Sequence, residues 1–180
     1  MPGGSAGDSF RSIPDGQINR LCEAADKIAE SIGRKFSSDD GVDRLGFCLT
    51  LMDGEGSTRL EHLAGKPLRE KVEAFKLNAS IKCRVMFEHR GDRAISSWQY
   101  RDMEAKPPVY GGGVLFDRIG CYGSISGYTQ PIDELVIIAL GAMYGYVSEE
   151  HIVALLAISG NSQDLFGEIR EEIMSICLAP

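Results

Sequence analysis

The segment 111–127 is rich in glycine and serine, and these residues are the first candidates for a binding site. Gly111, Gly112 and Gly113 precede the short apolar run 114–116. A phosphate loop needs the pattern GxxxxGK[ST] at the start of a helix, whereas these glycines lead into a predicted strand. Glycine also permits close approach of a ligand or another segment to the main chain. Two interpretations stay open: a bulge or turn, or glycine amides that line a ligand pocket.

Serine and acidic residues follow the same glycines. Ser124 and Ser126 lie on an apolar strand without the GxSxG pattern of a serine nucleophile, so we expect local hydrogen bonds or a place in a pocket wall. Tyr122 belongs to the same strand and is a further pocket candidate. The pair Asp133-Glu134 begins a predicted helix, where carboxylates cap free amides. No acid–base or nucleophile set stands out, so the sequence leaves catalysis undecided.

The three histidines are the candidate metal or haem ligands. His62 lies near the end of a predicted strand, His89 follows a predicted helix, and His151 lies in the first turn of another helix. None forms an HxH, HExxH or CxxCH pattern. Each is most simply a solvated or hydrogen-bonded side chain. His151 is the weakest proton carrier, because a helix N-terminus disfavours its cationic form.

Composition excludes several classes of function. The 180 residues suit one domain, and the net charge of −7 with scattered basic residues argues against nucleic-acid binding. The longest apolar stretch, 135–147, is too short to span a membrane. Residues 1–9 lack the basic and apolar regions of a signal peptide, so none is expected.

The five cysteines are dispersed, and they form no CxxC motif. They are Cys22, Cys48, Cys83, Cys121 and Cys177. Their apolar neighbours favour reduced, mostly buried thiols, which are typical of a reducing compartment. We therefore expect a cytoplasmic protein.

The hydrophobic pattern predicts two hairpins with helices between and after them. In chain order it predicts a helix over 18–32, strands over 44–52 and 57–63, and a helix over 67–87. A loop follows over 88–108, in which a short helix or an edge strand around 95–100 stays open. Strands over 114–116 and 119–126 and helices over 131–143, 148–158 and 162–177 complete the chain. Alternation in 44–52 indicates a strand with one buried face. Asp117-Arg118 fits a two-residue turn of the second hairpin. Together these elements predict an α/β (α+β) fold with an antiparallel sheet covered by helices.

The second hairpin also carries a family resemblance. The matching residues are Gly112-Gly113-Val114-Leu115-Phe116, Ile119 to Gly127, and Asp133-Glu134. This pattern resembles the GlcG/HbpS-like family, also called the haem-degrading domain family. Lys82-Cys83-Arg84 is similar to the Lys-Ala-Arg-like segment on the helix between the family's hairpins. Leu115 stands where the family usually has proline, and the helices over 148–177 extend beyond the family core.

The resemblance implies a profilin-like sheet of about five antiparallel strands, assembly into dimers or larger homo-oligomers, and haem or a related tetrapyrrole as a ligand. The expected organisation is a disordered tail over 1–12, a GlcG/HbpS-like domain over 13–145, and a C-terminal helical extension over 146–180 packed on that domain. The residues carried over as pocket or interface candidates are Gly111, Gly112, Gly113, Tyr122, Ser124 and Ser126. His62 and His89 are the candidate axial ligands of a haem iron.

The sequence therefore leaves two candidate functions. The first is a small-molecule-binding protein of this family, with haem or a related tetrapyrrole as its expected cofactor. The alternative is a non-catalytic interaction or assembly module. In that alternative, the helix over 131–143 and the C-terminal helices would form an oligomer interface.

Overall fold

The computed structural model describes residues 13–36 and 44–179, so the predicted tail over 1–12 lies outside the described residues. The helices are α1 (Asp15–Phe36), α2 (Val72–Glu88), α3 (Gln130–Met143), α4 (Glu149–Ser159) and α5 (Gln163–Cys177), and the short 3₁₀ helices are η1 (Arg69–Lys71), η2 (Arg90–Asp92) and η3 (Ser97–Tyr100). The strands are β1 (Gly46–Met52), β2 (Thr58–Gly65), β3 (Gly113–Phe116) and β4 (Cys121–Ser126). The predicted mixture of two hairpins and helices is thereby confirmed.

The strands form one antiparallel sheet in the order β2-β1-β4-β3. Each hairpin contributes one central strand and one edge strand, and β1 pairs with β4 across the middle. The sheet has four strands within the described residues, rather than the expected five or so. The antiparallel α+β architecture holds, and the profilin-like fold stays a prediction.

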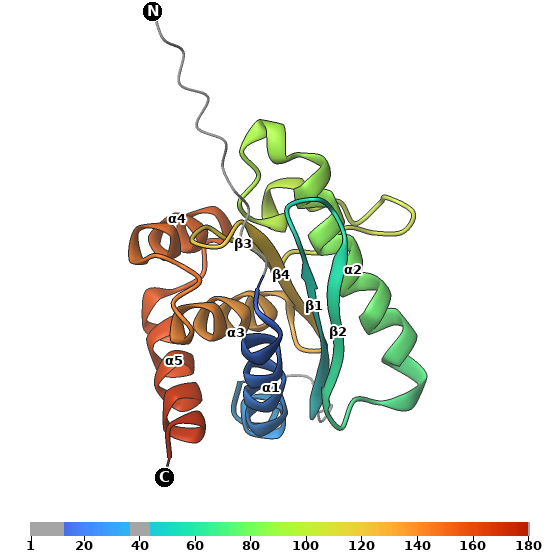
Figure 1. Ribbon diagram of the computed structural model, residues 1–180. Helices are drawn as coiled ribbons and strands as arrows, with labels where there is room; N and C mark the ends of the chain where they lie inside the picture. Colours follow the sequence, from blue (N-terminus) through green and yellow to red (C-terminus); the bar gives the residue numbers. More distant parts are fainter. Residues whose placement is uncertain (1–12, 37–43, 180) are drawn as a thin grey trace, which may run out of the picture.

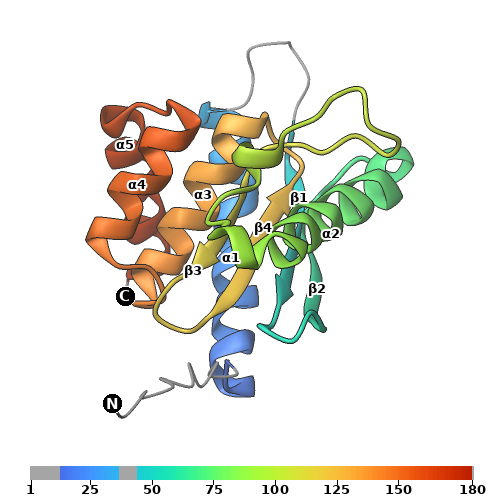
Figure 2. The ribbon, with the colours of Figure 1, turned by 90° about the horizontal axis from the view of Figure 1, so that it is seen from above.

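Helices cover both faces of the sheet. Helix α2 packs on one face, against β1 and β4, while α1 and α3 pack on the other (Figures 1 and 2). All seven residues of β1 are buried. The prediction of one buried face was therefore wrong: Phe47, Leu49 and Leu51 belong to the larger core beneath α1 and α3, and Met52 belongs to a smaller core beneath α2.

The turn of the second hairpin, between β3 and β4, is longer than expected. Strand β3 ends at Phe116 and β4 begins at Cys121, so residues 117–120 form the turn instead of Asp117-Arg118 alone. Gly120 has a φ of 66° and its amide donates to the Phe116 carbonyl at 2.8 Å. This left-handed conformation at Gly120 accounts for the longer turn, because it is readily adopted by glycine.

Helix α3 lies in the middle of the molecule. It contacts β3, β4, α1, α4 and α5, and every residue from 132 to 141 is buried. The sequence hypothesis that this helix forms an oligomer interface was wrong, because its apolar residues are already covered within one chain. The exposed side chains of Val153, Ile158 and Met174 keep the C-terminal helices as a predicted contact surface.

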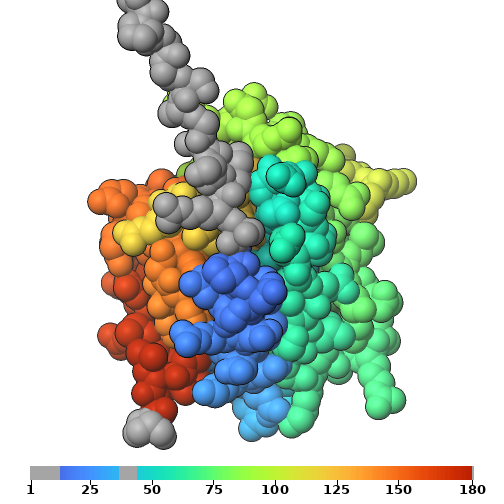
Figure 3. Space-filling view, in the orientation of Figure 1, coloured from blue at the N-terminus to red at the C-terminus, as the bar shows by residue number. Residues whose placement is uncertain are grey.

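The C-terminal helices pack on the domain as expected. Ser148 caps α4 by accepting from the His151 amide, and Ser162 caps α5 by accepting from the amides of Asp164 and Leu165. Helix α5 lies against α3 and α1. In the space-filling view, α1 (blue) lies on the surface beside α5 (red), with β2 on its other side (Figure 3). Within residues 13–36 and 44–179, none of the helices combines the length and apolar character needed to cross a membrane.

A buried aromatic ring provides a test of the packing between the hairpin and α3. Methyl groups added at Gly123 and Gly141 would lie 2.5 and 2.7 Å from the ring of Phe116, which is fully buried. We expect Gly123→Ala and Gly141→Ala each to lower the free energy of unfolding by about 1–3 kcal/mol, because the ring has no space to yield.

Urea unfolding measures this effect. Gly167→Ala is the matched control, since nothing lies within 4 Å of the added methyl group in α5. It should stabilise the protein by about 0.5–1 kcal/mol. Wild-type stability in Gly123→Ala would show that Phe116 is not held between these glycines.

Candidate functional site

A buried ion pair joins α2 to the start of α3. Lys82 Nζ donates to Asp133 Oδ2 at 2.9 Å and to the carbonyl of Ile125 at 2.6 Å. The side chains of Lys82 and Asp133 are only 1% and 3% exposed. Asp133 Oδ1 accepts a third hydrogen bond, from the Tyr128 amide at 3.0 Å. The pair thus connects α2, the end of β4 and α3.

Lys82 reaches this position because it lies on the sheet-facing side of α2. The buried residues of that helix are Ala79, Lys82, Cys83 and Met86. Their spacing is that of one helical face, so a lysine occupies a position that the pattern normally gives to an apolar residue. A buried ammonium needs a counter-charge and hydrogen-bond acceptors, and Asp133 with the Ile125 carbonyl provides both.

Burial changes the acidity of Asp133. Removal from water raises the pKa of its carboxyl to about 6, against the opposing effects of the Lys82 charge and hydrogen bond, the Tyr128 amide and Arg44. The pair is therefore ionised at neutral pH and loses its carboxylate charge under mildly acidic conditions. The sequence interpretation of Asp133 as a capping residue holds for one oxygen, which accepts from the Tyr128 amide just before α3, but it missed that Asp133 is also the buried partner of a lysine.

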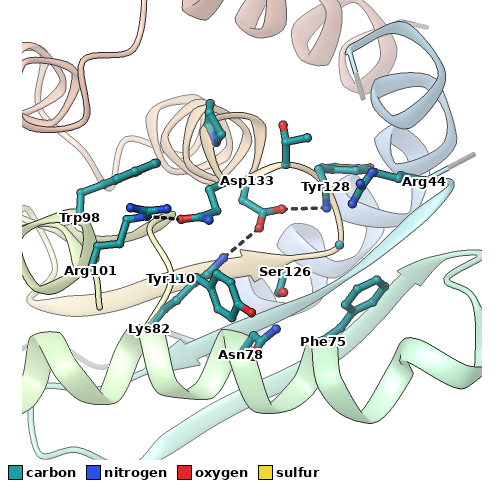
Figure 4. Close-up of a pocket in the computed structure, with 14 residues that line it drawn as sticks. Arg44, Phe75, Asn78, Lys82, Trp98, Arg101, Tyr110, Ser126, Tyr128 and Asp133 are labelled. Atoms are coloured by element: carbon teal, nitrogen blue, oxygen red, sulfur yellow. Dashed lines mark hydrogen bonds and ion pairs between the residues drawn. The ribbon is translucent and has the colours of Figure 1, made fainter. Parts of the chain in front are cut away.

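A cavity of about 530 Å³ opens above this ion pair. Its walls come from α2, the segment 98–110, the end of β4 and the first turn of α3 (Figure 4). The lining side chains include Arg44, Phe75, Asn78, Lys82, Trp98, Arg101, Tyr110, Ser126, Tyr128, Thr129, Gln130 and Asp133. A cavity of this volume is in the usual range for a small-molecule site.

The cavity is cationic although the chain is acidic. Among the described residues, its lining has three cationic side chains, Arg44, Lys82 and Arg101, and one carboxylate, Asp133. These described side chains therefore carry a net formal charge of +2, in a protein with a net charge of −7. The N-terminus of α3 also borders the cavity, and the Thr129 side chain makes no capping hydrogen bond there. Both features favour an anionic ligand.

A polar cluster positions Arg101 at one end of the cavity. Arg101 Nε donates to Gln130 Oε1 at 3.0 Å, and the same oxygen accepts from the Gly111 amide at 3.0 Å. The guanidinium carbon of Arg101 lies 5.7 Å from the centre of the Trp98 ring. Gln130 thus links the glycine run to the arginine.

The three glycines bring the main chain close to the chain's own side chains. A methyl group at Gly111 would overlap the Trp98 indole, and one at Gly112 would lie 2.9 Å from Asp133 Cβ and 3.2 Å from Lys82 Nζ. Gly112 also has a φ of 100°. The Gly113 amide donates to Ser97 Oγ at 2.9 Å. The sequence left open a bulge or turn, or glycine amides that line a ligand pocket. The structure shows close internal packing and a turn conformation at these positions. A direct role in ligand binding stays a prediction.

Of the other three pocket candidates, one lines the cavity and two lie outside it. Ser126 lines the cavity. Ser124 lies beneath α2, where its hydroxyl donates to the Ala79 carbonyl at 2.7 Å and accepts from Cys83 Sγ at 3.3 Å. Tyr122 packs on Phe87, with ring centres 6.3 Å apart. Ser124 and Tyr122 therefore contribute to the packing between α2 and the sheet.

The predicted histidine ligands lie at separate places outside the cavity. His62 Nε2 lies 3.1 Å from Asp26 Oδ1 on α1. The His89 ring stacks on Tyr100 with centres 4.1 Å apart, and its Nδ1 lies 3.3 Å from Asp92 Oδ2. No histidine, cysteine or methionine lines the cavity among the residues with a described position, so a haem iron held by His62 or His89 does not fit this cavity. No group of three or more His, Cys, Asp or Glu side chains in the same described residues is arranged to hold a metal ion.

Glu134 forms a second buried polar cluster, behind the cavity wall. Its Oε1 accepts from Ser96 Oγ at 3.1 Å and its Oε2 accepts from Asn161 Nδ2 at 2.6 Å. Burial raises the pKa of this carboxyl to about 7. Glu134, also interpreted from sequence as a cap, thus joins the segment that carries Trp98 to the turn between α4 and α5.

Comparison of the chain with known protein-family models, with curated proteins and with solved structures finds no match.

Sequence reasoning missed most of the cavity wall. Arg44, Arg101 and Tyr110 lie in loops and Trp98 lies in the short 3₁₀ helix η3, where hydrophobic periodicity carries no signal. One available signal was Lys82, a charged residue within the apolar face of a helix. Another was the single tryptophan, Trp98, within an otherwise polar segment.

The ion pair can be tested with a double-mutant cycle. Lys82→Met removes the ammonium that pairs with the buried Asp133 carboxylate, and Asp133→Asn removes the charge opposite a buried ammonium. We expect each substitution to lower the free energy of unfolding by about 3–5 kcal/mol, and the double variant to lose less than the sum of the two. Lys82→Met should also regain stability on acidification, because its uncompensated carboxyl takes up a proton. Urea unfolding at pH 5 and pH 8 measures both effects, and additive losses would contradict the pairing.

Glu134 provides a pH-dependent test. Its folded-state pKa of about 7 exceeds the ordinary value of 4.5, so the folded protein binds the proton more tightly. This contribution is fully present below pH 4.5 and is lost as pH rises through 7, and its size is about 3 kcal/mol. We expect Glu134→Gln to flatten the fall in unfolding free energy between pH 5 and pH 7.5. Glu55→Gln, at an exposed position, is the control, and an unchanged slope in Glu134→Gln would contradict the assignment.

Proposed function

We propose that this protein binds a small anionic molecule in the cavity above Lys82 and Asp133. The observation that carries the proposal is the net formal charge of +2 on the described lining residues of a cavity of about 530 Å³, in a chain with a net charge of −7. A cationic cleft in an acidic protein concentrates anions locally, because the surrounding surface repels them.

The remaining lining suits the organic part of such a ligand. Phe75, Trp98, Tyr110 and Tyr128 offer aromatic surface, while Asn78 and Ser126 offer neutral hydrogen-bonding groups. Ligand sites typically combine apolar walls with a few placed polar groups. The GlcG/HbpS-like resemblance supports the same class of function, because ligand binding is what that resemblance implies.

Haem is one anionic molecule within this proposal, on account of its two propionate groups. Arg44 and Arg101 are suitable partners for carboxylates. Iron ligation by His62 or His89 is a separate proposal, because these side chains lie outside the cavity. Haem would supply redox or ligand-sensing chemistry when bound, whereas the chain's residues supply charge, aromatic surface and hydrogen bonds.

An aromatic sulfonate tests binding in the cavity. We expect 8-anilino-1-naphthalenesulfonate to bind the wild-type protein at one saturable site, because its anionic and aromatic parts match the lining. Asn78→Phe adds bulk within the cavity wall and should weaken binding at least tenfold. Leu77→Phe places the same side chain next along α2 at a residue that is 52% exposed, and binding should be unchanged. Fluorescence titration measures this, and equal binding by both variants would contradict the proposal.

Hemin forms the second arm of the same experiment. A saturable shift of the Soret band supports a tetrapyrrole ligand, and its absence contradicts one. Loss of the shift in Asn78→Phe assigns hemin to the cavity. Loss in His62→Ala or His89→Ala assigns iron ligation to that histidine instead.

A further inference from the structure

We propose that the ligand carries one anionic group on a body rich in hydroxyl groups. Arg101 binds the anionic group, and Asn78, Tyr110 and Ser126 hydrogen-bond to the hydroxyl groups. The corresponding chemical class is a sugar acid or a sugar phosphate ester, since both join one anionic group to a polyhydroxylated body. This inference rests on the proposed function and specifies the ligand of the same cavity.

Ser126 presents a buried hydroxyl to the cavity. The residue is only 6% exposed, and no hydrogen bond joins its Oγ to another group within residues 13–36 and 44–179. Ser124 lies on the same face of β4, and its hydroxyl both donates and accepts. A buried hydroxyl without a partner costs free energy. Because Ser126 lines the cavity, a hydroxyl group of a ligand would provide its partner.

Asn78 and Tyr110 add two neutral polar groups of the same kind. Both line the cavity, and neither side chain hydrogen-bonds to another of the described residues. In Figure 4 the hydroxyls of Tyr110 and Ser126 and the amide of Asn78 lie in the same part of the cavity. A serine or tyrosine hydroxyl both donates and accepts, and so does an asparagine amide through its two polar atoms. These groups are matched by ligand hydroxyl groups, which also donate and accept.

Arg101 is the cation that remains for a ligand among the described lining residues. Lys82 is paired with Asp133 at 2.9 Å, and Arg44 has interactions of its own. Arg101 forms no ion pair with a carboxylate in the part of the chain that the structure describes. Its Nε donates to Gln130, so its two terminal nitrogens retain four N–H donors. Their planar arrangement matches two oxygens of a carboxylate or a phosphate.

The backbone places Arg101 opposite Tyr110. Asp102 and Val109 form an antiparallel bridge, with amide-to-carbonyl hydrogen bonds of 3.0 and 2.7 Å. Arg101 and Tyr110 are the next pair in this register, so they face each other across the two segments. An anionic group at Arg101 would therefore have a hydroxyl-binding group beside it. Sugar acids have the same arrangement, because a hydroxyl group follows the carboxylate along their carbon chain.

Aromatic side chains complete the match to a sugar-like body. Phe75, Trp98 and Tyr110 line the cavity with ring surface. Aromatic rings pack against the C–H faces of sugar rings, whose edges carry the hydroxyl groups. An alkyl acid would contact the same rings and leave Asn78 and Ser126 without partners. A site built from such polar groups discriminates against a ligand that lacks the matching hydroxyls.

The single tryptophan makes the proposal measurable without a label. Trp98 is the only tryptophan of the chain and it lines the cavity beside Arg101, so its fluorescence reports on bound ligands. The probes are gluconate, glucuronate and glucose 6-phosphate at constant ionic strength. The comparison compounds are hexanoate, which has charge without hydroxyl groups, glucose, which has hydroxyl groups without charge, and inorganic phosphate. We expect at least one probe to bind about tenfold more tightly, or better, than all three comparison compounds. The two sugar acids, compared with glucose 6-phosphate, distinguish a carboxylate from a phosphate.

Ser126→Ala tests the hydroxyl-binding part of the cavity. The hydroxyl that it removes makes no hydrogen bond to the described residues, so the fold should be retained. We expect it to weaken binding of the hydroxylated probe about fivefold and to leave binding of the aromatic sulfonate unchanged. Ser57→Ala is the matched control, because it removes an exposed hydroxyl outside the cavity. Equal binding of the probe by these two variants would overturn the proposal.

Arg101→Gln tests the anion-binding end. It should weaken binding of the same probe about tenfold or more, because it removes the charge that the anionic group contacts. Arg118→Gln removes the same charge from the exposed turn between β3 and β4, outside the cavity, and should bind like the wild-type protein. If Arg118→Gln weakens binding as much as Arg101→Gln, general attraction replaces a site at Arg101.

The outcomes separate this inference from the proposed function. If the aromatic sulfonate binds in the cavity while no hydroxylated probe binds better than hexanoate, glucose and phosphate, the polyhydroxylated ligand is wrong and anion binding stands. If the sulfonate binds equally to Asn78→Phe and Leu77→Phe, the proposed function itself fails.

Discussion

The burial of one ammonium group constrains the rest of this structure. Lys82 lies on the apolar face of α2, so its charge must be compensated inside the protein. Asp133 can provide that compensation only if the start of α3 lies at the end of β4. The chain between them turns so that the Tyr128 amide completes the hydrogen bonds of the carboxylate. A charge in the core thereby determines how the hairpin, α2 and α3 meet.

The same constraint gives the cavity its polar base. Gly112 brings the main chain against the ion pair, where a larger residue would collide with Asp133. Gly111 packs on Trp98 and donates to Gln130, which in turn holds Arg101. Packing requirements around the pair and the placement of Arg101 in the cavity wall thus depend on the same few residues. A side chain at either glycine would disturb the cavity wall as well as the packing around the ion pair.

The sequence predicted the regular elements better than it predicted the site. Turn residues and capping serines such as Ser148 and Ser162 act locally, so the helices that they begin could be placed from the sequence. The cavity joins residues far apart in the chain, including Arg44, Arg101 and Asp133. Asp133 was interpreted as a cap because an acidic residue at a helix start has that local use. Its long-range role follows only from the burial of Lys82, which the helical pattern alone does not reveal.

The central position of α3 has a consequence for how the chain is made. This helix begins at Gln130, after both hairpins and α2, yet its buried residues complete the core on one face of the sheet. A nascent chain that ends before Gln130 contains β1 to β4, but Phe116 and Ile125 lack the helix that covers β3 and β4 on that face. Exposed apolar sheet surface is a target for chaperones and for aggregation. If the strands pair before α3 is made, we expect this face of the sheet to be open to other chains until the rest of the protein emerges.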